Sequence, residues 1–494
     1  MGLIPTIGLE IHIELNTLSK MFCGCFNDSK ETEPNKNICP VCSAQPGTLP
    51  AANAEAVKKT IKTALALNCQ IASSSFFERK NYFYPDLPKG YQISQYQAPL
   101  SKNGYLDLPI CSKRIRIERI HLEEDTGSLA HPEGVDYSLV NLNRAGVPLM
   151  ELVTKPDIHT AQEAVEFVKE LQMILRYLGV SGANMEKGEM RAEVNISLAK
   201  EGEILGNKVE IKNLNSIKVV EKSIEYETKR QGEILEKGEK IIQETRGFNE
   251  QKQATFSQRE KESAHDYRYF PEPDLPPIDI SPEEIEQIKN SIPELPNQKR
   301  ARFAKEYGLT TQETELYTSQ KELGDYFEQV VSDLNAWVAD KYQKGLSEQE
   351  TQKLFKLASN YIATDLQAIL KERDIDDFAV QTFKITPENF AEFLSMIYLG
   401  EISSKIAKMV ILEMFENGGD PTQIIEDKGW QMISNETEIQ KAIQEVLSAN
   451  QKAVDDYKKG KQASLQFLAG IVMAKTKGKA NPQKVQEILK EILI

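Results

Sequence analysis

The stretch IGLEIHIEL at residues 7–15 alternates apolar and polar side chains at every position. In an extended chain one face would carry only aliphatic side chains, and the other would carry Glu10 and His12. This period of two with one polar face is typical of an antiparallel strand between a core and either a wet cavity or open solvent. Shorter alternating runs follow at residues 191–198 and 209–212. The sequence therefore predicts a sheet with one polar face.

One helix has clear limits in the sequence. Thr160 is a good N-cap, Glu163 would complete a capping box, and an apolar stripe follows until Gly179 ends the pattern. Proline-rich segments at residues 270–282 and 292–296 interrupt both periodicities, and beyond them the pattern is helical. We place a domain boundary at these segments.

Length and composition restrict the class of protein. The chain has 494 residues, which suggests two to four domains, and a formal net charge of −14. That charge argues against a protein covered with nucleic acid over its whole surface. The chain has no apolar run of the ~20 residues needed to span a bilayer, and its first residues do not resemble a signal peptide. Six cysteines in so long a chain do not make a disulfide framework, and we expect a cytoplasmic protein.

Four cysteines form the strongest local motif. Cys23-Gly-Cys25 is followed, after thirteen residues, by Cys39-Pro-Val-Cys42. Two close pairs at this separation supply four thiolates to a tetrahedral zinc, and four sulfurs leave no open position for a substrate. The sequence predicts a structural zinc site, with four unconnected thiols as the alternative.

A second set of polar residues is typical of a magnesium and phosphate site. Glu10 and His12 project to one side of their strand, and further acidic and basic residues occur at 121–125 and 143–151. Carboxylates provide the hard oxygen ligands that magnesium prefers, and cations neutralise phosphoryl oxygens. A solvated polar face is the alternative. The alternation slips near Glu118, so the pattern does not choose between the next two glutamates, 123 and 124.

Several familiar motifs are absent from the sequence. The chain has no Gly-x-x-x-x-Gly-Lys-Ser/Thr phosphate loop, no Gly-x-Gly-x-x-Gly dinucleotide motif and no Gly-x-Ser-x-Gly nucleophile turn. Any ATP site must therefore be of another kind. The chain also offers no evident nucleophile for hydrolysing glutamine.

The carboxy-terminal region is locally basic. Residues 457–486 hold seven lysines and no acidic residue, and Asn481-Pro482 predicts the start of a last helix. In so acidic a chain a local basic patch indicates contact with a phosphate backbone. A lysine face that is merely solvated is the alternative.

Many stretches, in the same order, resemble the B subunit of the tRNA-dependent amidotransferase, the GatCAB complex. The resemblance covers nearly the whole chain, and its tail resembles the YqeY-like module. The stretches are GLEIHIEL (8–15), KMFCGC (20–25) with CPVC (39–42), RKNYFYPDLPKGYQISQY (79–96), HLEEDTG (121–127), LNRAGVPLMEL (142–152), EIKNLNS (210–216), ETRGFNE (244–250), DYRYFPEPDLPP (266–277), SSKIAK (403–408), DYKKGK (456–461) and KGKANPQ (477–483).

The resemblance implies an α+β chain in three parts. Residues 1–292 would form a cradle of antiparallel sheet and helices, with the zinc knuckle at residues 23–42. Residues 293–400 would form an all-α helical domain. Residues 401–494 would form an all-α, YqeY-like tail that binds tRNA.

The resemblance also implies an activity. ATP would phosphorylate the side-chain carboxylate of Glu-tRNA(Gln) or Asp-tRNA(Asn), and ammonia would then displace the phosphate. An A subunit would supply the ammonia by hydrolysing glutamine, and a small C subunit would hold the other two together. Two other classes stay open at this point: a tRNA-binding module without enzymatic activity, and a metal-dependent hydrolase that needs neither ATP nor tRNA.

The matching motifs carry the expected site residues. The resemblance places magnesium on His12, Glu124 and Glu151, with Glu10 beside them. The chain departs from the family at Asn141, where aspartate is common, and in reading Ala-Glu where the family often has Cys-Asp before residue 194. From the same motifs we predict that ATP is bound by Lys80, Tyr82, Lys89, Asn143, Arg144, Glu193 and Asn195.

Overall fold

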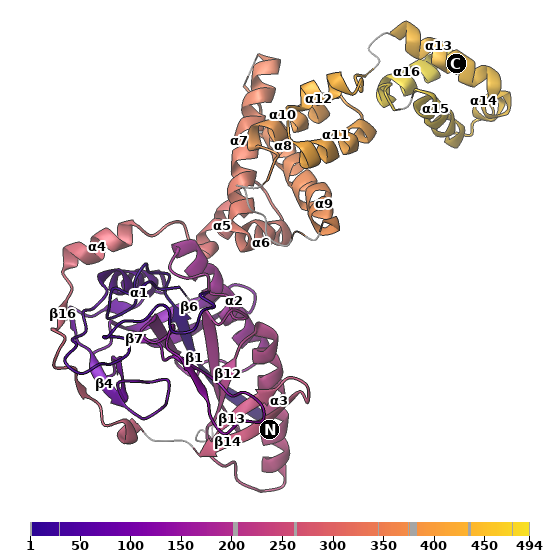
Figure 1. The fold of residues 1–494 in the computed structure, drawn as a ribbon. Helices are drawn as coiled ribbons and strands as arrows, with labels where there is room; N and C mark the ends of the chain where they lie inside the picture. The colour runs from indigo at the N-terminus through magenta and orange to yellow at the C-terminus, as the bar shows by residue number, and fades with distance from the viewer. Residues whose placement is uncertain are drawn as a thin grey trace. The chain divides into compact units, whose positions relative to one another are not determined.

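The computed structural model describes residues 2–28, 30–200, 206–260, 264–343, 345–373, 375, 383–432, 436–476 and 478–493. The chain divides into two compact units, Met1–Asn297 and Gln298–Ile494, each of which is described by itself. Figure 1 shows that the sheet belongs to the first unit and that the second is helical. The α+β class predicted from the sequence is confirmed.

Nine described strands form the main sheet of the first unit, in the order β14-β13-β12-β11-β1-β10-β7-β6-β2. Neighbouring strands are antiparallel except β12 and β13, which are parallel, so the predicted antiparallel sheet is mixed at one place. The strands are β1 (Leu3–Glu14), β2 (Gln70–Ile71), β6 (Ser101–Leu108), β7 (Lys113–Glu124), β10 (Pro148–Thr154), β11 (Met190–Lys200), β12 (Val209–Leu214), β13 (Glu244–Asn249) and β14 (Ala254–Glu260).

One face of this sheet holds the core. The aliphatic side chains of residues 7–15 are buried, as predicted, and they share one apolar cluster with side chains from α1 (Ala54–Ala66), α2 (Ala161–Leu178) and α3 (Ile217–Glu236). Because the helices cover the apolar face, the polar face of β1 is left for other contacts. Burial of aliphatic surface at roughly 25 cal/mol per Å² makes this cluster the main source of stability in the unit.

The helix predicted between Thr160 and Gly179 is confirmed as α2. The Thr160 hydroxyl accepts the Glu163 N–H at 3.1 Å, and Gly179 has a left-handed backbone with φ of 66°. The capping box differs from the prediction in one detail. The Glu163 carboxylate accepts the N–H of His159 at 2.8 Å, one residue before the expected donor, and also binds Lys113.

A β-bulge changes the phase of β7. Its pairing with β10 jumps from Arg119 to Ile117, so Glu118 has no partner in the register. The side chains of Ile117 and Ile120, three residues apart, both point into the core. The predicted slip in the alternation is therefore a bulge, and it decides which later side chains of β7 lie on the polar face.

Short elements surround the polar face. The strands β4 (Glu78–Asn81), β5 (Tyr91–Ser94) and β15 (Phe270–Pro271) form a small sheet, and the 3₁₀ turn η1 (Ala264–Tyr267) leads into it. Arg79 on β4 makes two hydrogen bonds to the buried carboxylate of Glu272, which fastens the proline-rich segment across the unit. The other short elements are β3 (Ser74–Ser75) paired with β16 (Ile278–Asp279), β8 (Ser128–Ala130) paired with β9 (Leu139–Asn141), and α4 (Pro282–Asn290).

The described elements beyond residue 295 are helices with two apolar clusters. The first runs from Phe303 to Ile425 and the second from Ile439 to Leu493. The predicted limits at 292/293 and 400/401 stay predictions, although the first cluster continues past residue 400. The helices are α5 (Pro296–Glu306), α6 (Thr311–Ser319), α7 (Lys321–Tyr342), α8 (Glu348–Asn360), η2 (Tyr361–Leu366), α9 (Gln367–Glu372), α10 (Pro387–Tyr398), α11 (Ser404–Asn417), α12 (Pro421–Asp427), α13 (Glu436–Ala449), α14 (Gln451–Lys458), α15 (Ala463–Lys475) and α16 (Pro482–Leu493).

Two sequence expectations concern these helices and the membrane. Asn481 begins the last helix as predicted, since its side-chain oxygen accepts the N–H groups of Gln483 and Lys484 at 2.9 and 3.2 Å. Within the part of the chain that the structure describes, no helix is long and apolar enough to cross a membrane.

Candidate active site and cysteine cluster

The four cysteines of the two predicted pairs come together. The sulfurs of Cys23, Cys25, Cys39 and Cys42 all lie within 4.8 Å of one another, and those of Cys25 and Cys42 are 3.9 Å apart. Four thiols at this spacing suit a tetrahedral metal ion. Cys42 is the member of the cluster that most readily forms a thiolate. Hydrogen bonds from Cys23 and the backbone of Cys39, together with the Lys20 ammonium, lower the pKa of Cys42 to about 4.

A lysine connects this cluster to a distant loop. Lys20 is almost fully buried, and its ammonium lies 3.7 Å from the Cys42 sulfur and donates to the carbonyl of Leu142 at 3.3 Å. A buried ammonium is tolerated because the thiolate charge and the carbonyl replace its water. Beside it, the N–H of Met21 donates to the carbonyl of Gly146 at 2.7 Å.

Asparagines fasten the segment between the cysteine pairs to the same loop. The Asn35 side chain accepts the N–H of Leu142 at 2.7 Å and donates to the carbonyl of Val140 at 3.0 Å. Asn143 accepts the N–H of Asn37 at 3.0 Å, and Asn141 accepts the N–H of Asn35 at 3.2 Å. Asn143, predicted to bind ATP, therefore has a structural contact here. The departure at Asn141 leaves this acceptor oxygen in place, since amide and carboxylate oxygens both accept hydrogen bonds.

The polar face of the sheet gathers carboxylates and imidazoles from three strands. The Nε2 atom of His12 on β1 lies 3.4 Å from Glu151 on β10, 3.6 Å from Glu123 on β7 and 3.9 Å from Glu10 on its own strand. His121 on β7 lies 3.5 Å from Glu151 and 3.8 Å from Glu123. The pairing of β1 with β10 and of β10 with β7 brings His12, Glu151 and His121 into one row across the sheet.

The titration behaviour of this row follows from its burial. Burial, with the charges of Glu151 and Glu193, raises the pKa of Glu10 to about 7. Burial opposes protonation of His12, but its hydrogen bond to Glu151 and the neighbouring carboxylates outweigh burial and raise the pKa of His12 to about 9. The pKa of Glu151 lies well below its ordinary value, because the nearby histidines overcome the cost of burying its charge. The site thus keeps anionic oxygens available for a cation.

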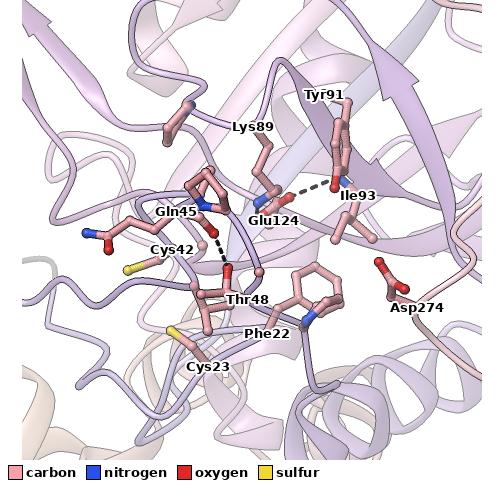
Figure 2. Close-up of a pocket in the computed structure, with 17 residues that line it drawn as sticks. Phe22, Cys23, Cys42, Gln45, Thr48, Lys89, Tyr91, Ile93, Glu124 and Asp274 are labelled. Atoms are coloured by element: carbon pink, nitrogen blue, oxygen red, sulfur yellow. Dashed lines mark hydrogen bonds and ion pairs between the residues drawn. The ribbon is translucent and has the colours of Figure 1, made fainter.

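Glu124 does not lie in this row, although the resemblance groups it with His12 and Glu151, and its role as a magnesium ligand stays a prediction. Past the bulge, Glu124 shares the face of the buried Leu122, and its carboxylate binds Lys89 at 2.6 Å and the N–H of Ile93 at 3.0 Å. Figure 2 shows Glu124 and Lys89 together in a separate cavity of about 260 Å³ beside Cys23 and Cys42. Glu123 occupies the place near His12 that the sequence motif predicts for Glu124.

The remaining predicted ATP residues fall into three places. Lys80 lies near the row, where the carboxylates of Glu123 and Glu151 raise its pKa despite burial, and Tyr82 lies beside it. Glu193 pairs with Lys212 at 2.9 Å, and Asn195 follows it on the same face of β11. Lys89 lies in the other cavity, with Glu124.

Arg144 binds a carboxylate pair at the end of β1. It donates to Glu14 at 3.0 Å and to Asp125, which also accepts from Arg191 at 3.2 Å. These two arginines lower the pKa of Asp125 although burial opposes it. The ion pairs hold the loop after β9 against β1 and β7.

Several side chains that line the row were not predicted from the sequence. A cavity of about 340 Å³ covers the row and is lined from distant strands. Most of the missed residues fall inside the quoted motifs, so a signal is present in the sequence, but only sheet register shows that they meet. They are His121, Arg119, Lys208, Glu210, Lys212, Tyr96, Tyr267 and Tyr269.

Comparisons with known proteins agree with this arrangement. A family model described as the GatB/GatE catalytic domain matches residues 5–286, and another described as the GatB domain matches residues 325–493. A Persephonella marina protein, named as the B subunit of aspartyl/glutamyl-tRNA(Asn/Gln) amidotransferase, is 47% identical over 492 residues, which cover 99% of each chain. The chain belongs to the GatB family. GatB relatives with the same name from Thermotoga maritima and Caldicellulosiruptor saccharolyticus are each 46% identical and cover 99% of this chain and 98% of their own.

The GatB catalytic-domain match contains every residue of the row and of the cysteine cluster. The other match, the GatB domain, covers most of the helical unit and the lysine-rich region. Membership of the GatB family is compatible with both candidate metal sites, and their geometry supports both.

Proposed function

We propose that this chain is the B subunit of a tRNA amidotransferase and that its polar row is the site where a misacylated tRNA is activated. The substrate would be the side-chain carboxylate of Glu-tRNA(Gln) or Asp-tRNA(Asn), in line with the name that its relatives carry. The observation that supports the proposal most is the row of His12, Glu123 and Glu151, since Glu151 lines a cavity that is also lined by several cations.

The chemistry follows from the poor electrophilicity of a carboxylate. One of its oxygens attacks the γ-phosphorus of ATP, the bond to the oxygen of ADP breaks, and an acyl phosphate forms. Ammonia then attacks the acyl carbon, phosphate leaves, and the amide remains after loss of a proton. An A subunit that hydrolyses glutamine would supply the ammonia, and a C subunit would complete the complex.

The donors of the row suit magnesium. Three carboxylates and one imidazole offer mainly oxygen ligands, the preference of this ion. We assign it to His12, Glu123 and Glu151 with Glu10 adjacent, since their donor atoms lie within 4 Å of the His12 Nε2. His12 would release its proton when the ion binds, because only the neutral imidazole has a free lone pair. Bound there, magnesium would neutralise phosphoryl oxygens. Lys80, Arg119 and Lys212 would orient the phosphates from the rim.

The cysteine cluster would hold zinc in a structural role. Four sulfurs complete a tetrahedron and leave no coordination position for a substrate. The contacts from Lys20 and Asn35 suggest that the ion stabilises the loop at residues 140–146 and, through it, Arg144. We expect the ion to contribute more to folding than to chemistry.

Substitutions at Glu123 and Glu124 should distinguish the two neighbouring carboxylates. Glu123→Gln should lower magnesium-dependent phosphorylation of the misacylated tRNA about 10²-fold, because it removes a charged ligand from the row. Glu124→Gln should weaken its ion pair with Lys89 but leave the magnesium dependence of phosphorylation unchanged. Acyl-phosphate formation is measured against magnesium concentration for both variants. A shifted magnesium dependence in Glu124→Gln alone would make Glu124 the ligand and remove Glu123.

The tail is proposed to bind the tRNA backbone, but with fewer lysines than the seven in its sequence. Lys475 pairs with Glu445, Lys479 donates to the carbonyl of Gly429, and Lys461 pairs with Asp456 at 3.1 Å. Lys477 lies outside the described residues. Lys461 and Lys475 are exposed despite these pairs, and the other exposed lysines that the structure describes in this stretch are Lys458, Lys459 and Lys484.

We expect Lys458→Ala/Lys459→Ala/Lys484→Ala to weaken tRNA binding and reduce its salt dependence. Each lost phosphate contact should lower the slope of log affinity against log salt by about 0.7–0.9. Truncation at Asn450 would be a poorer test, because removing α14–α16 would expose the apolar side chains of α13. Affinity is measured by filter binding at several salt concentrations.

The matched control removes three exposed lysines from the other helical cluster, as Lys353→Ala/Lys356→Ala/Lys371→Ala. This variant should keep the wild-type salt slope, and ATP binding should be normal in both triple variants. Equal slopes for both variants and the wild type would show that the tail lysines are only a solvated surface.

A further inference from the structure

Two stacked tyrosines stand at the rim of the cavity over the polar row. The rings of Tyr96 and Tyr269 have centroids 4.6 Å apart and planes only 13° from parallel. Both residues line the same cavity as Glu10, His121 and Glu151. Tyr269 covers one face of the Tyr96 ring, yet the Tyr96 side chain is still 46% exposed, so the other face is open to a ligand.

The backbone holds this pair in place from both sides. The buried carboxylate of Glu78 accepts the N–H groups of Tyr96 and Gln97, each at 2.7 Å. On the other side, the Asn81 amide donates to the carbonyls of Tyr267 and Arg268 at 3.1 and 3.0 Å. A platform fixed before the ligand arrives loses little conformational entropy on binding.

A cation and further aromatic rings continue from the pair into the cavity. The ammonium of Lys80 lies 5.2 Å from the ring centroid of Tyr267, whose ring meets that of Tyr269 edge-on at 6.1 Å. Arg119 and Lys212 line the same cavity. The rim therefore offers a flat apolar surface, and the interior holds cations and carboxylates. A nucleoside joined to phosphates or to an ester has the same arrangement, with a flat base at one end and polar groups at the other.

The size of the cavity sets a limit on what it encloses. Its volume is about 340 Å³, near the lower end of the ~300–1,000 Å³ of typical ligand pockets. The proposed reaction brings a triphosphate, a cation and an amino-acid ester together on the row. A base attached to one of them must then lie at the rim, where the open face of Tyr96 is found.

We propose that the Tyr96–Tyr269 pair binds an adenine ring by stacking. The inference rests on the proposed function, which brings two adenosines to this cavity: that of ATP and the one that ends the tRNA acceptor strand. Stacking suits either source, because every base offers a π face and no hydrogen-bond readout is needed. The two sources share one chemistry and differ in what is attached to the ribose.

The test compares Tyr96→Ala and Tyr96→Phe in the assembled complex. ATP affinity is measured by equilibrium dialysis, and acceptor-stem affinity is measured with an RNA minihelix that ends in CCA and with one that lacks the terminal adenosine. Tyr96→Ala should weaken one adenosine ligand at least ten-fold, equivalent to about 1.4 kcal/mol. Tyr96→Phe should bind like the wild type, because its ring keeps the stacking face.

The pattern of losses identifies the source. Weaker ATP binding with unchanged minihelix binding assigns the platform to the nucleotide. Weaker binding of the CCA minihelix, with no change for the shortened one, assigns it to the terminal adenosine. Affinities within two-fold of the wild type for both ligands, or an equal loss in Tyr96→Phe, would overturn the proposal.

Two controls separate this result from other failures. Tyr84→Ala removes a tyrosine that is 54% exposed and lies outside the cavity, and it should leave both affinities unchanged. The wild-type complex is first tested for ATP-dependent acyl-phosphate formation. If the wild type forms no acyl phosphate, the proposed function is wrong. The affinities of Tyr96→Ala are measured without turnover, so they test only the role of the tyrosine pair.

Discussion

The variant His12→Ala is expected to lower ATP-dependent phosphorylation of the misacylated tRNA by about 10²–10³-fold. Its imidazole faces the carboxylates of Glu123 and Glu151 within 3.6 Å, at the centre of the row. Removing one group that stabilises developing charge in a site of this kind commonly costs about 2.7–4 kcal/mol of barrier. The rate of acyl-phosphate formation in a single turnover, at saturating ATP and magnesium, measures the effect directly.

The same variant should leave other properties of the complex unchanged. Glutamine hydrolysis by the glutaminase of the complex is proposed to need no group of the row and should persist. His131→Ala is a matched control, because His131 is exposed and its Nδ1 atom lies 2.7 Å from the hydroxyl of Ser138, away from the row. A His12→Ala complex that amidates at nearly the wild-type rate would remove His12 from the site.

The variant Cys39→Ser is expected to lose the metal ion and to lower the melting temperature by about 10 °C. Metal binding at such sites contributes to folding free energy, and a loss of several kcal/mol shifts Tm by about 2–4 °C per kcal/mol in chains of 150–250 residues. Elemental analysis of zinc per chain and a thermal melt measure the two effects.

Cys111→Ser is the control for this prediction, since Cys111 is half-buried and lies outside the cluster. It should keep one zinc per chain and the wild-type Tm. Wild-type protein that contains no zinc after purification without a chelator would contradict the assignment. A Cys39→Ser variant that retains the ion would show that three sulfurs are sufficient.

The parts of the structure that follow from local chemistry were predictable from the sequence. Alternation alone determines the buried face of residues 7–15, and the Thr160 cap and Gly179 determine the limits of α2. The cysteine spacing predicts a cluster that the structure brings together. Each of these features depends on residues close to one another in the chain.

The membership of the active site was less predictable, because it depends on register. Glu210 and Lys212 reach the row only through the pairing of β12 with β11, and Tyr269 arrives from a segment beyond the main sheet. Whether Glu123 or Glu124 faces the row depends on one unpaired residue upstream, Glu118. The periodicity of the sequence suggested an irregularity near this residue but could not determine its exact position. The domain limits in the helical part were also hard to predict, because the apolar face of a helix does not show which other helix it packs against.

The bulge at Glu118 gives β7 one residue more than regular pairing with β10 requires. Because Ile117 and Ile120 both point into the core, deleting Glu118 would leave them two positions apart in a regular strand. His121 and Glu123 would then still face the row, and Leu122 would stay in the aliphatic core. Substituting Glu118, which is half-buried, would disturb two surface ion pairs, with Lys155 at 3.0 Å and with Arg119 at 3.8 Å. At this position the faces of the later side chains would therefore survive the loss of one residue, and a substitution would be nearly silent.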